Sequence, residues 1–473
     1  MKRPGVQPPS LLGFSHNRRS APAHDSRPLT QPLAAVVMAA GLGTRMKSAT
    51  PKHLHPLLGR PLVAWVLDAL RAVGPSRLVL ISSPESAAEL AASFPGVEVV
   101  VQEKPRGTGD AVAAARQALE RFEGDLLVLA GDTPLLTPEA IEELVDEHHR
   151  EGAAVTLLSI EPEGRRPYGR IVRDEKGELA AIVEERDATP EQREIRELNA
   201  SVYVFSAPDL WWALGEVGTG NAQGELYLTD TIARLVREGK RAVVHRFQDP
   251  DVAEGVNTRA DLALVASLLR KRILTAHMLA GVTVVDPGTT WIEADVQIDP
   301  DAVIQPFTVL RGRTVVRGEA EIGPHVVAID AEIGQGATVG PFCYLRPGSV
   351  LAAGSKAGTF VEMKNAQIGE RSKVPHLSYI GDAQIGEDTN IGAGAITANY
   401  REERFEEKQR TVIGSNVHTG SQNVFVPPVE IGDNAWTGAG SAITEDVPNG
   451  ALAIARARQV NKEGYDDARQ RND

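Results

Sequence analysis

The first half of the chain alternates short apolar runs with segments of helical spacing. The uncharged run 33–40 is followed by an amphipathic segment at 62–72 and by strand-like runs at 77–82, 97–102 and 126–130. Apolar runs without polar alternation are typical of parallel strands that are buried on both faces. The alternation therefore predicts a doubly wound α/β sheet, whose ligands bind at the carboxyl ends of the strands.

The second half of the chain has a different period. From about Ile292 onward, Ile or Val followed by Gly recurs at separations that are mostly multiples of about six, with slips of one residue. One aliphatic residue per hexad can point into a core, the small residue after it permits a tight corner, and three hexads close one coil. The pattern predicts a β-solenoid of stacked coils.

Between the two halves, residues 261–279 carry Leu, Val and Ile at helical spacing, which predicts a connecting helix. The first ~30 residues are rich in Pro, Arg, Lys and Ser and lack the apolar core of a secretion signal, so we expect them to be disordered. The predicted division is a disordered tail at 1–32, an α/β domain at 33–260, a connecting helix at 261–283, a solenoid at 284–455, and a C-terminal arm and tail at 456–473.

Composition narrows the classes of partner. The formal net charge of −13 argues against a nucleic acid or an anionic membrane as the main partner. No apolar segment approaches the ~18 residues of a membrane span, so we expect no membrane insertion. The single cysteine, Cys343, excludes an internal disulfide and lies in an apolar run that favours a core position. These features predict a cytoplasmic protein.

The first apolar run leads directly into Gly41-Leu42-Gly43. Glycine allows positive φ and a close approach of the backbone to a ligand, so the N–H groups of this loop can point at one anion. Thr44, Arg45 and Lys52 add a hydroxyl and two cations, which suits a triphosphate. A Rossmann fingerprint would need a third glycine at Met46, and the sequence of a Walker A loop is absent. An ordinary glycine turn after a strand is the alternative.

Asp132 follows the buried run 126–130 and is thereby placed at the edge of the sheet. An oxygen ligand at this edge can take Mg²⁺ beside substrate phosphates. Capping of the next helix or turn is an equal alternative on spacing alone.

The pattern Gly-x-Gly-Thr-Arg-Met followed by Pro51-Lys52 resembles the signature loop of sugar-1-phosphate nucleotidylyltransferases. The resemblance implies a Rossmann-like nucleotidylyltransferase domain that binds Mg²⁺ through Asp132 and Asn257, while Arg45 and Lys52 stabilise charge during catalysis. The family usually has Asn-Thr where this chain has Asn199-Ala200, which leaves the sugar preference open. The residues implied for UTP and uridine are Leu42, Gly43, Arg45, Lys52, Gln102, Gly107 and Thr108, and those implied for the sugar phosphate are Gly169, Glu184 and Asn199.

Chemically reactive residues also stand inside the hexapeptide repeats. Arg346, Lys364, His376 and Tyr379 occupy positions where a scaffold needs only small or polar residues. Cations near one another suit a sugar phosphate, and an imidazole suits removal of a proton from an amine that attacks a thioester. The repeats resemble those of left-handed β-helix acyltransferases, which are typically homotrimers.

From Leu33 to the last ~20 residues, the chain resembles the bacterial bifunctional family that carries glucosamine-1-phosphate N-acetyltransferase and N-acetylglucosamine-1-phosphate uridylyltransferase activity. The resemblance implies His376 as the general base, Glu362 as the residue that orients it, and a backbone N–H of Ala393 that meets the thioester oxygen. The acetyltransferase sugar-phosphate site would comprise Arg346, Lys364, Tyr379 and Asn390, and the acetyl-CoA site would comprise Ala393, Asn399, Tyr400, Ser421, Ala439 and Arg456. Asn399 and Tyr400 would also line the glucosamine site.

The implied function is acetyl transfer from acetyl-CoA to glucosamine-1-phosphate, followed by uridylyl transfer from UTP to N-acetylglucosamine-1-phosphate. Two features depart from the family pattern: the charged segment from Arg401 to Lys408 is longer, and Pro375 restricts the backbone before His376. One alternative is a nucleotidylyltransferase that uses its solenoid only for assembly or regulation. The other is a non-catalytic scaffold or nucleotide sensor.

Overall fold

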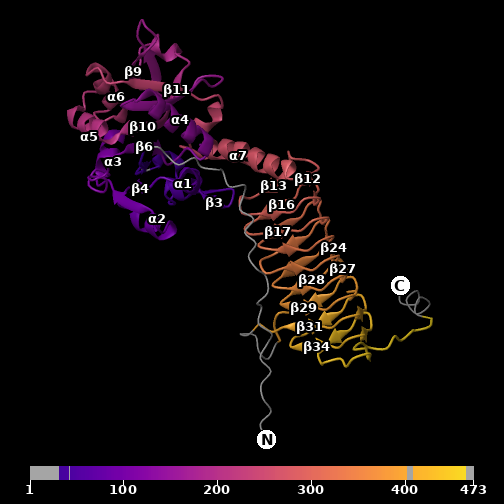
Figure 1. Cartoon of the computed structure of the whole chain (residues 1–473). Helices are drawn as coiled ribbons and strands as arrows, with labels where there is room; N and C mark the ends of the chain where they lie inside the picture. The colour runs from indigo at the N-terminus through magenta and orange to yellow at the C-terminus, as the bar shows by residue number, and fades with distance from the viewer. Residues whose placement is uncertain (1–30, 42, 402–407, 465–473) are drawn as a thin grey trace, which may run out of the picture. The chain divides into compact units, whose positions relative to one another are not determined.

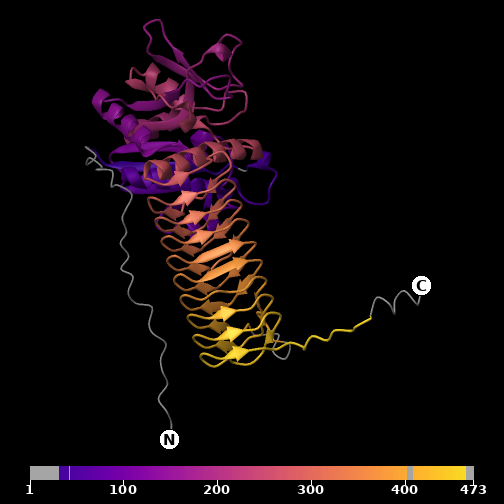
Figure 2. The ribbon, with the colours of Figure 1, turned by 90° about the vertical axis from the view of Figure 1, so that its right-hand side faces the viewer.

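The computed structural model describes residues 31–41, 43–401 and 408–464. Its chain forms two compact units, which Figures 1 and 2 colour by residue number. The first unit contains the residues up to His55 together with Leu62–Asn257. The second unit contains Pro56–Pro61 and the residues from Thr258 onward. Leu42 and the segment 402–407, both of which carry predictions, lie outside the described residues.

The first unit is built on a nine-stranded mixed sheet, seven strands of which follow the order β11-β7-β10-β6-β1-β4-β5 (Figure 1). The strands are β1 (Leu33–Ala39), β4 (Arg77–Ser82), β5 (Glu98–Val101), β6 (Asp125–Ala130), β7 (Val155–Ile160), β8 (Arg170–Arg173), β9 (Leu179–Val183), β10 (Leu198–Ser206) and β11 (Ala242–Arg246). β1 pairs in parallel with β4 and β6, whereas β10 runs antiparallel to β6 and β7. The predicted α/β class is confirmed, with β10 and the β8–β9 hairpin as its antiparallel parts.

Helices cover both faces of this sheet. The helices of the first unit are α1 (Leu62–Val73), α2 (Ala87–Ser93), α3 (Thr108–Ala114), α4 (Pro138–Glu151), α5 (Ala207–Glu216) and α6 (Leu228–Arg237), with short 3-10 turns at η1 (Thr44–Met46), η2 (Lys52–Leu54), η3 (Gln192–Glu194) and η4 (Pro250–Ala253). Leu33 and Ala35 of β1 pack in one core with α1, α2 and α4, while Ala34 and Val36 pack in the other with α3, α5 and α6. Because both faces of β1 are buried, its sequence is apolar without alternation.

The second unit begins with α7 (Arg259–Leu279), the predicted connecting helix. A capping box starts it: the Thr258 hydroxyl accepts from the Asp261 N–H at 3.2 Å, and the Asp261 carboxylate accepts from the Thr258 N–H at 2.8 Å. The hairpin of β2 (Pro56–Leu57) and β3 (Arg60–Pro61) also belongs to this unit, because Ala294 N–H donates to the Leu58 carbonyl at 3.1 Å. Among the described residues, no helix is long and apolar enough to cross a bilayer.

Short parallel strands form three ladders along the rest of the second unit, and their arrows are seen stacked in Figure 2. One ladder holds β12 (Thr283–Val284), β15 (Val303–Ile304), β18 (Glu321–Ile322), β21 (Thr338–Val339), β24 (Lys356–Thr359) and β27 (Lys373–His376), and farther along the chain β32 (His418–Thr419), β35 (Trp436–Thr437) and β37 (Leu452–Ala453). The second holds β13 (Trp291–Ile292), β16 (Val309–Arg311), β19 (Val327–Ile329), β22 (Tyr344–Leu345), β25 (Glu362–Lys364), β28 (Tyr379–Gly381), β30 (Ile396–Thr397), β33 (Val424–Phe425) and β36 (Ala442–Ile443). The third holds β14 (Gln297–Ile298), β17 (Val315–Val316), β20 (Glu332–Ile333), β23 (Val350–Leu351), β26 (Gln367–Ile368), β29 (Ala383–Ile385), β31 (Thr411–Ile413) and β34 (Val429–Ile431).

The register of the ladders matches the predicted repeat. Val303 pairs with Glu321, Glu321 with Thr338, Thr338 with Lys356 and Lys356 with Lys373, so one coil takes 18 or 17 residues, or three hexads. In a typical strand the first residue is exposed and the aliphatic second residue is buried in the core. The predicted left-handed parallel β-helix is thereby confirmed as the fold class.

Cys343 lies inside this core, as predicted. Its thiol donates to the Gly358 carbonyl at 2.7 Å, and burial raises the pKa of the thiol to about 11. The thiol is therefore protonated at neutral pH and has a packing role.

Candidate active sites

The glycine loop follows the carboxyl end of β1. Gly43 adopts the left-handed conformation with φ 60° and ψ 25°. A Cβ at this position would lie 2.8 Å from the Cβ of Lys52, closer than real Cβ contacts allow. Only glycine permits both this backbone conformation and the close approach of Lys52. The loop therefore brings the cation of η2 against the end of the first strand.

Four of the predicted residues meet beside this loop. The Lys52 ammonium contacts the Asp132 carboxylate and lies 3.3 Å from the Asn257 side-chain oxygen. The Arg45 guanidinium donates to the same Asn257 oxygen at 2.9 Å. Lys52 is 9% exposed, whereas Arg45 is exposed, so only the Lys52–Asp132 pair of this cluster is shielded from water. Residues from three distant parts of the sequence thus form one polar centre.

The donor set of this centre fits a magnesium ion that is shared with a substrate. One carboxylate oxygen of Asp132 and the amide oxygen of Asn257 both face the Lys52 ammonium. Two oxygens that converge on one positive charge are also the kind of ligands that Mg²⁺ prefers. Within the described residues, no group of three or more His, Cys, Asp or Glu side chains could hold a metal by itself. The remaining ligands would have to come from substrate phosphates and water.

His53 is buried beside this centre. His53 is 4% exposed. Burial, together with the positive charge of Lys52, lowers the pKa of its imidazole to about 4, and the negative charge of Asp132 opposes this shift with a smaller effect. The imidazole is therefore neutral at physiological pH and adds no third cation to the site.

The predicted uracil segment is anchored to the start of α6. Gly107 has φ 109°, and a Cβ there would lie 2.4 Å from the Leu226 carbonyl oxygen. The Thr108 hydroxyl accepts from the Leu228 N–H at 3.0 Å. The Gln102 amide donates to the Asp110 carboxylate at 2.8 Å. The segment that contains Leu226 and Leu228 thus holds this loop in place.

The predicted sugar residues converge between β8, β9 and β10. Asn199 N–H donates to the Gly169 carbonyl at 2.8 Å, and a Cβ on Gly169 would lie 3.6 Å from the Glu184 carboxylate. The Asn199 amide donates to the Tyr203 hydroxyl at 2.7 Å, and the Thr229 hydroxyl donates to Glu184 at 3.1 Å. Burial raises the pKa of Glu184, although the Thr229 bond opposes this. Sequence reasoning missed Tyr203 and gave Thr229 no site role, because these partners meet only in the folded sheet.

Ala200, the departure from the family pattern, packs in the core that contains Leu198 and Val202. Consecutive strand residues point to opposite faces, so Ala200 faces away from Asn199. A threonine hydroxyl at position 200 would therefore point toward the core side of β10.

In the β-helix, several predicted acetyltransferase residues stand one above another. We define the corner column as Thr359, His376, Ala393, Ser421 and Ala439, each of which precedes a residue with positive φ. Backbone hydrogen bonds join successive members. From the second member onward, the N–H of the following residue donates to the carbonyl of the member one coil earlier, and the four N–O distances are 2.9, 3.1, 2.7 and 2.8 Å along the column. Four predicted residues therefore share one edge of the solenoid.

Within this column, the N–H of Ala393 donates no hydrogen bond to any described residue, and Ala393 is half-buried. A free amide is what the predicted contact with the thioester oxygen requires. The aliphatic side chain of Arg456 lies near Gly440 in the last coil, where a Cβ would be 3.9 Å from the Arg456 Cδ. The predicted residues for acetyl-CoA thus extend from Ala393 along the edge toward the C-terminal arm.

A cationic cluster occupies the neighbouring face. The Arg346 N–H donates to the Met363 carbonyl at 2.9 Å, which sets Arg346 beside Lys364 on adjacent coils. Contact with Lys408 lowers the pKa of Lys364, so two ammonium groups face each other there. Such a cluster attracts an anion. Lys408, which sequence analysis treated only as the end of a loop, joins the predicted phosphate residues.

Other predicted residues extend this face. Glu362 pairs with Arg346 at 3.1 Å, and its proposed role toward His376 stays a prediction. The Tyr379 hydroxyl donates to the Asn399 side-chain oxygen at 2.8 Å, and the Asn399 amide donates to Asp382. Asn390 bridges β27 and β32 in the adjacent ladder, and Tyr400 is exposed.

Pro375 is accommodated by a close backbone contact. A Cβ on Gly358 would lie 2.0 Å from the Pro375 carbonyl oxygen. Pro375 sits in β27, an extended segment that suits its fixed φ. The glycine one coil earlier therefore provides room for the proline before His376.

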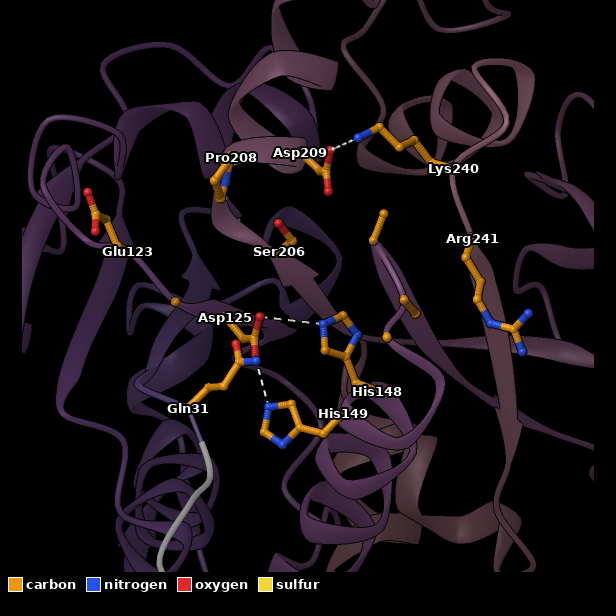
Figure 3. A pocket seen from close by; sticks show the side chains of 14 residues that line it. Gln31, Glu123, Asp125, His148, His149, Ser206, Pro208, Asp209, Lys240 and Arg241 are labelled. Carbon is orange, nitrogen blue, oxygen red and sulfur yellow. Dashed lines mark hydrogen bonds and ion pairs between the residues drawn. The ribbon is translucent and has the colours of Figure 1, made fainter.

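A further polar pocket of about 680 Å³ lies near the amino end of β6 (Figure 3). Its Asp125 carboxylate contacts His149 at 2.7 Å and His148 at 3.5 Å, and Lys240 pairs with Asp209 at 2.9 Å. Burial raises the pKa of Asp125, but the hydrogen bonds of the two histidines outweigh it, so the net shift is downward. None of the predicted site residues line this pocket, and Asp132 lies beyond the opposite end of the same strand.

Comparisons with known proteins agree with both halves of this description. A family model described as the MobA-like NTP transferase domain matches residues 35–201. The bifunctional protein GlmU of Streptomyces coelicolor is 47% identical over 456 residues, covering 92% of this chain and 94% of that protein. Proteins of the same name from Pseudarthrobacter chlorophenolicus and Mycobacterium tuberculosis are each 46% identical, over 458 and 456 residues, and cover 92% and 91% of this chain and 92% of their own lengths.

The class that emerges is a nucleotidyltransferase domain followed by a transferase domain of hexapeptide β-helix type. The similarity to the relatives runs through both parts, because it spans more than nine tenths of the chain. The chain belongs to the family of bifunctional GlmU proteins.

Proposed function

We propose that the chain catalyses two consecutive steps in the synthesis of UDP-N-acetylglucosamine, each in its own unit. The second unit transfers an acetyl group from acetyl-CoA to glucosamine-1-phosphate. The first unit then transfers a uridylyl group from UTP to N-acetylglucosamine-1-phosphate and releases diphosphate. The convergence of Arg45, Lys52, Asp132 and Asn257 on one centre is the observation that carries the uridylyl half, and the corner column supports the acetyl half.

In the uridylyl step, a phosphate oxygen of the sugar phosphate attacks the α-phosphorus of UTP while the bond to the β-phosphate oxygen breaks. Arg45 and Lys52 lie where they can neutralise the charge that develops on the triphosphate. Mg²⁺ held by Asp132, Asn257 and the substrate phosphates would add positive charge at the same point. Gly169, Glu184 and Asn199 bind and orient the sugar, so that the reaction proceeds between two fixed groups.

In the acetyl step, the amine of glucosamine-1-phosphate attacks the thioester carbonyl carbon. His376 takes the amine proton, the carbon–sulfur bond breaks, and the CoA sulfur leaves. The N–H of Ala393, one coil from His376, donates to the oxygen as negative charge develops on it. Arg346, Lys364 and Lys408 hold the sugar phosphate, because three cations lie on this face.

We further propose that the protein is a homotrimer. A row of apolar corner residues, Phe307, Phe342, Phe360 and Leu377, is between 46% and 61% exposed in the single chain. The His325 ring lies between Phe307 and Phe342 in this row. The ring centroids are 4.7 Å apart for Phe307 and His325, 4.8 Å for His325 and Phe342, and 5.1 Å for Phe342 and Phe360. Stacked exposed aromatics that run along one edge are typical of a buried interface between subunits. The row leads directly to His376, so a neighbouring subunit would also enclose the acetyltransferase edge.

Omission of single substrates tests both activities. Purified full-length protein is given glucosamine-1-phosphate, acetyl-CoA, UTP and Mg²⁺, and free thiol and diphosphate are followed separately. Thiol should appear without UTP, whereas diphosphate should require every component. Diphosphate released from N-acetylglucosamine-1-phosphate without any thiol release from glucosamine-1-phosphate would leave only the nucleotidylyltransferase and assign the β-helix to assembly.

A His376→Ala variant separates the two units. It should lose acetyl transfer, because no other group in the corner column can accept the amine proton, and it should keep uridylyl transfer from N-acetylglucosamine-1-phosphate. Both rates are measured on one protein preparation. Loss of both activities in a folded variant would contradict independent sites.

A further inference from the structure

A small cavity of about 220 Å³ in the first unit gathers five arginines, Arg165, Arg166, Arg170, Arg193 and Arg196. We call this cavity the arginine pocket; Pro162, Gly164, Glu194, Ile195 and Leu198 complete its lining. Five arginines and one glutamate therefore line a single space, in a chain whose formal net charge is −13, although Arg166 is engaged by Glu254 at 2.9 Å. This concentration of positive charge is local and opposes the overall charge of the protein.

The ion pairs of the rim are weakly held. Arg165 pairs with Glu194, but their side chains are 72% and 68% exposed. Arg196 is 72% exposed and lies 3.5 Å from its carboxylate partner. Arg193 forms no ion pair with any described carboxylate. Exposed ion pairs contribute little to stability, so these guanidinium groups can exchange their partners for a bound anion at little cost.

Arg170 gives the pocket a buried donor. The residue is 2% exposed, and it pairs with Glu185 and donates to the Arg193 carbonyl at 3.4 Å. Its Nε, however, has no hydrogen-bond partner among the described residues. Buried N–H groups are rarely left without an acceptor, so an unpartnered guanidinium N–H in the wall of a cavity indicates a missing ligand.

The chemistry and size of the pocket limit what this ligand can be. Arginine presents planar, fixed N–H donors that match phosphate oxygens in pairs. A space of about 220 Å³ is below the ~300–1,000 Å³ of sites for larger cofactors. We propose that the arginine pocket is a second anion site, which binds a compact phosphate oxyanion, either inorganic diphosphate or a small phosphate monoester.

The pocket lies behind the sugar-phosphate segment. Arg170 is the register partner of Leu198, and these residues adjoin Gly169 and Asn199 in sequence. Since consecutive residues of extended strands point to opposite faces, the pocket and the sugar residues share a backbone but not a surface. None of the residues proposed for the sugar or the metal line the pocket.

An occupant should therefore influence sugar binding through the shared strands. An anion bound to Arg170 would restrict the motion of the backbone that carries the hydrogen bond between Asn199 N–H and the Gly169 carbonyl. Sugar binding would then lose less conformational entropy, because these strands are already ordered. This consequence rests on the proposed uridylyl function. It appears as a lower KM for N-acetylglucosamine-1-phosphate when a phosphate monoester is present, with kcat nearly unchanged.

Calorimetric titration tests the site directly. Inorganic diphosphate or glycerol 3-phosphate is added to the full chain in saturating UTP without sugar phosphate, so that the glycine loop is occupied and turnover cannot begin. Saturable binding of one ligand is expected, and the one that binds more tightly identifies the class. Arg193→Gln and Arg196→Gln should each weaken this binding about tenfold or more, because each removes a charged hydrogen-bond donor. Both residues are exposed, so the fold should persist.

Arg237→Gln is the matched control, since it removes one exposed arginine of the same unit whose Nε donates to the Ala233 carbonyl in α6. It should bind like the wild type. Equal affinity in the wild type, R193Q and R196Q would overturn the proposal, and so would the absence of saturable binding of both ligands to the wild type. Binding of UTP to the wild type is measured first, without any other ligand. If UTP does not bind, the proposed uridylyl function is contradicted, and the two phosphate ligands are then titrated in the absence of UTP.

Discussion

Replacement of Gly43 by alanine should impair uridylyl transfer while leaving acetyl transfer intact. The new Cβ would lie 2.8 Å from the Lys52 Cβ, and ordinary contact begins at 3.4 Å, so Lys52 must move by about 0.6 Å or more. Displacement of a positioned group by roughly 1 Å can cost about 10²-fold in rate. The left-handed backbone adds strain of about 1–2 kcal/mol for any residue with a Cβ.

Gly152→Ala is the matched control for strain alone. Gly152 has φ 55° and ψ 41°, close to the values of Gly43, but nothing lies within 4 Å of the position that a Cβ would take there. G43A should lose at least as much free energy of unfolding as G152A in urea titrations, because it adds the contact with Lys52 to the same backbone strain, and only G43A should lose uridylyl transfer, measured as kcat/KM from diphosphate release. Wild-type uridylyl activity in G43A, or an equal loss in G152A, would refute the reasoning.

Three further outcomes are expected. His53 should titrate near pH 4 when its imidazole is followed by NMR. The same side chain has a pKa of about 6.5 in the unfolded chain, so the free energy of unfolding should fall by about 3 kcal/mol as the pH drops from 6.5 toward 4. A pKa near 6.5 in the folded protein would contradict the burial of His53. If the proposed trimer forms through the stacked row, Phe342→Glu should reduce the mass measured by analytical ultracentrifugation toward that of a monomer, since it places a charge in the row; an unchanged mass would exclude this row as the interface. Gly358→Ala should lower acetyl transfer and cost about 1–3 kcal/mol in chemical unfolding, because its Cβ would press on the Pro375 carbonyl beside His376, and a variant with full acetyl transfer would show that His376 tolerates the shift.

The elements of the sheet could be predicted closely where one physical signal dominates. The apolar run 33–40 became β1 (Leu33–Ala39), and the run 77–82 became β4 with the same bounds, because burial on both faces demands uninterrupted apolar residues. Helix α3 (Thr108–Ala114) shows where such a local signal ends. Its start is set by a contact with a distant segment, since the Gly109 N–H donates to the Leu226 carbonyl at 2.8 Å.

Other features had no local signal. β10 runs antiparallel to β6 and β7, although its composition resembles that of a parallel strand. The hairpin Pro56–Pro61 belongs with the second unit, although the sequence places it inside the first domain. In both cases the decisive interactions join residues far apart in the chain, and a sequence pattern reports only neighbours.

The sequence by itself determined the two architectures, because periodic burial is written directly into the spacing of apolar residues. It also supplied the residue types of both sites through their motifs. Only the tertiary structure decided which of these residues meet: Lys52 with Asp132 and Asn257, and His376 in one column with Ala393 and Ser421. It alone disclosed the arginine pocket, whose five arginines come from the segment that ends at the start of β8 and from the segment that follows β9. Convergence of this kind depends on strand order and register, which the whole fold sets and no single segment encodes.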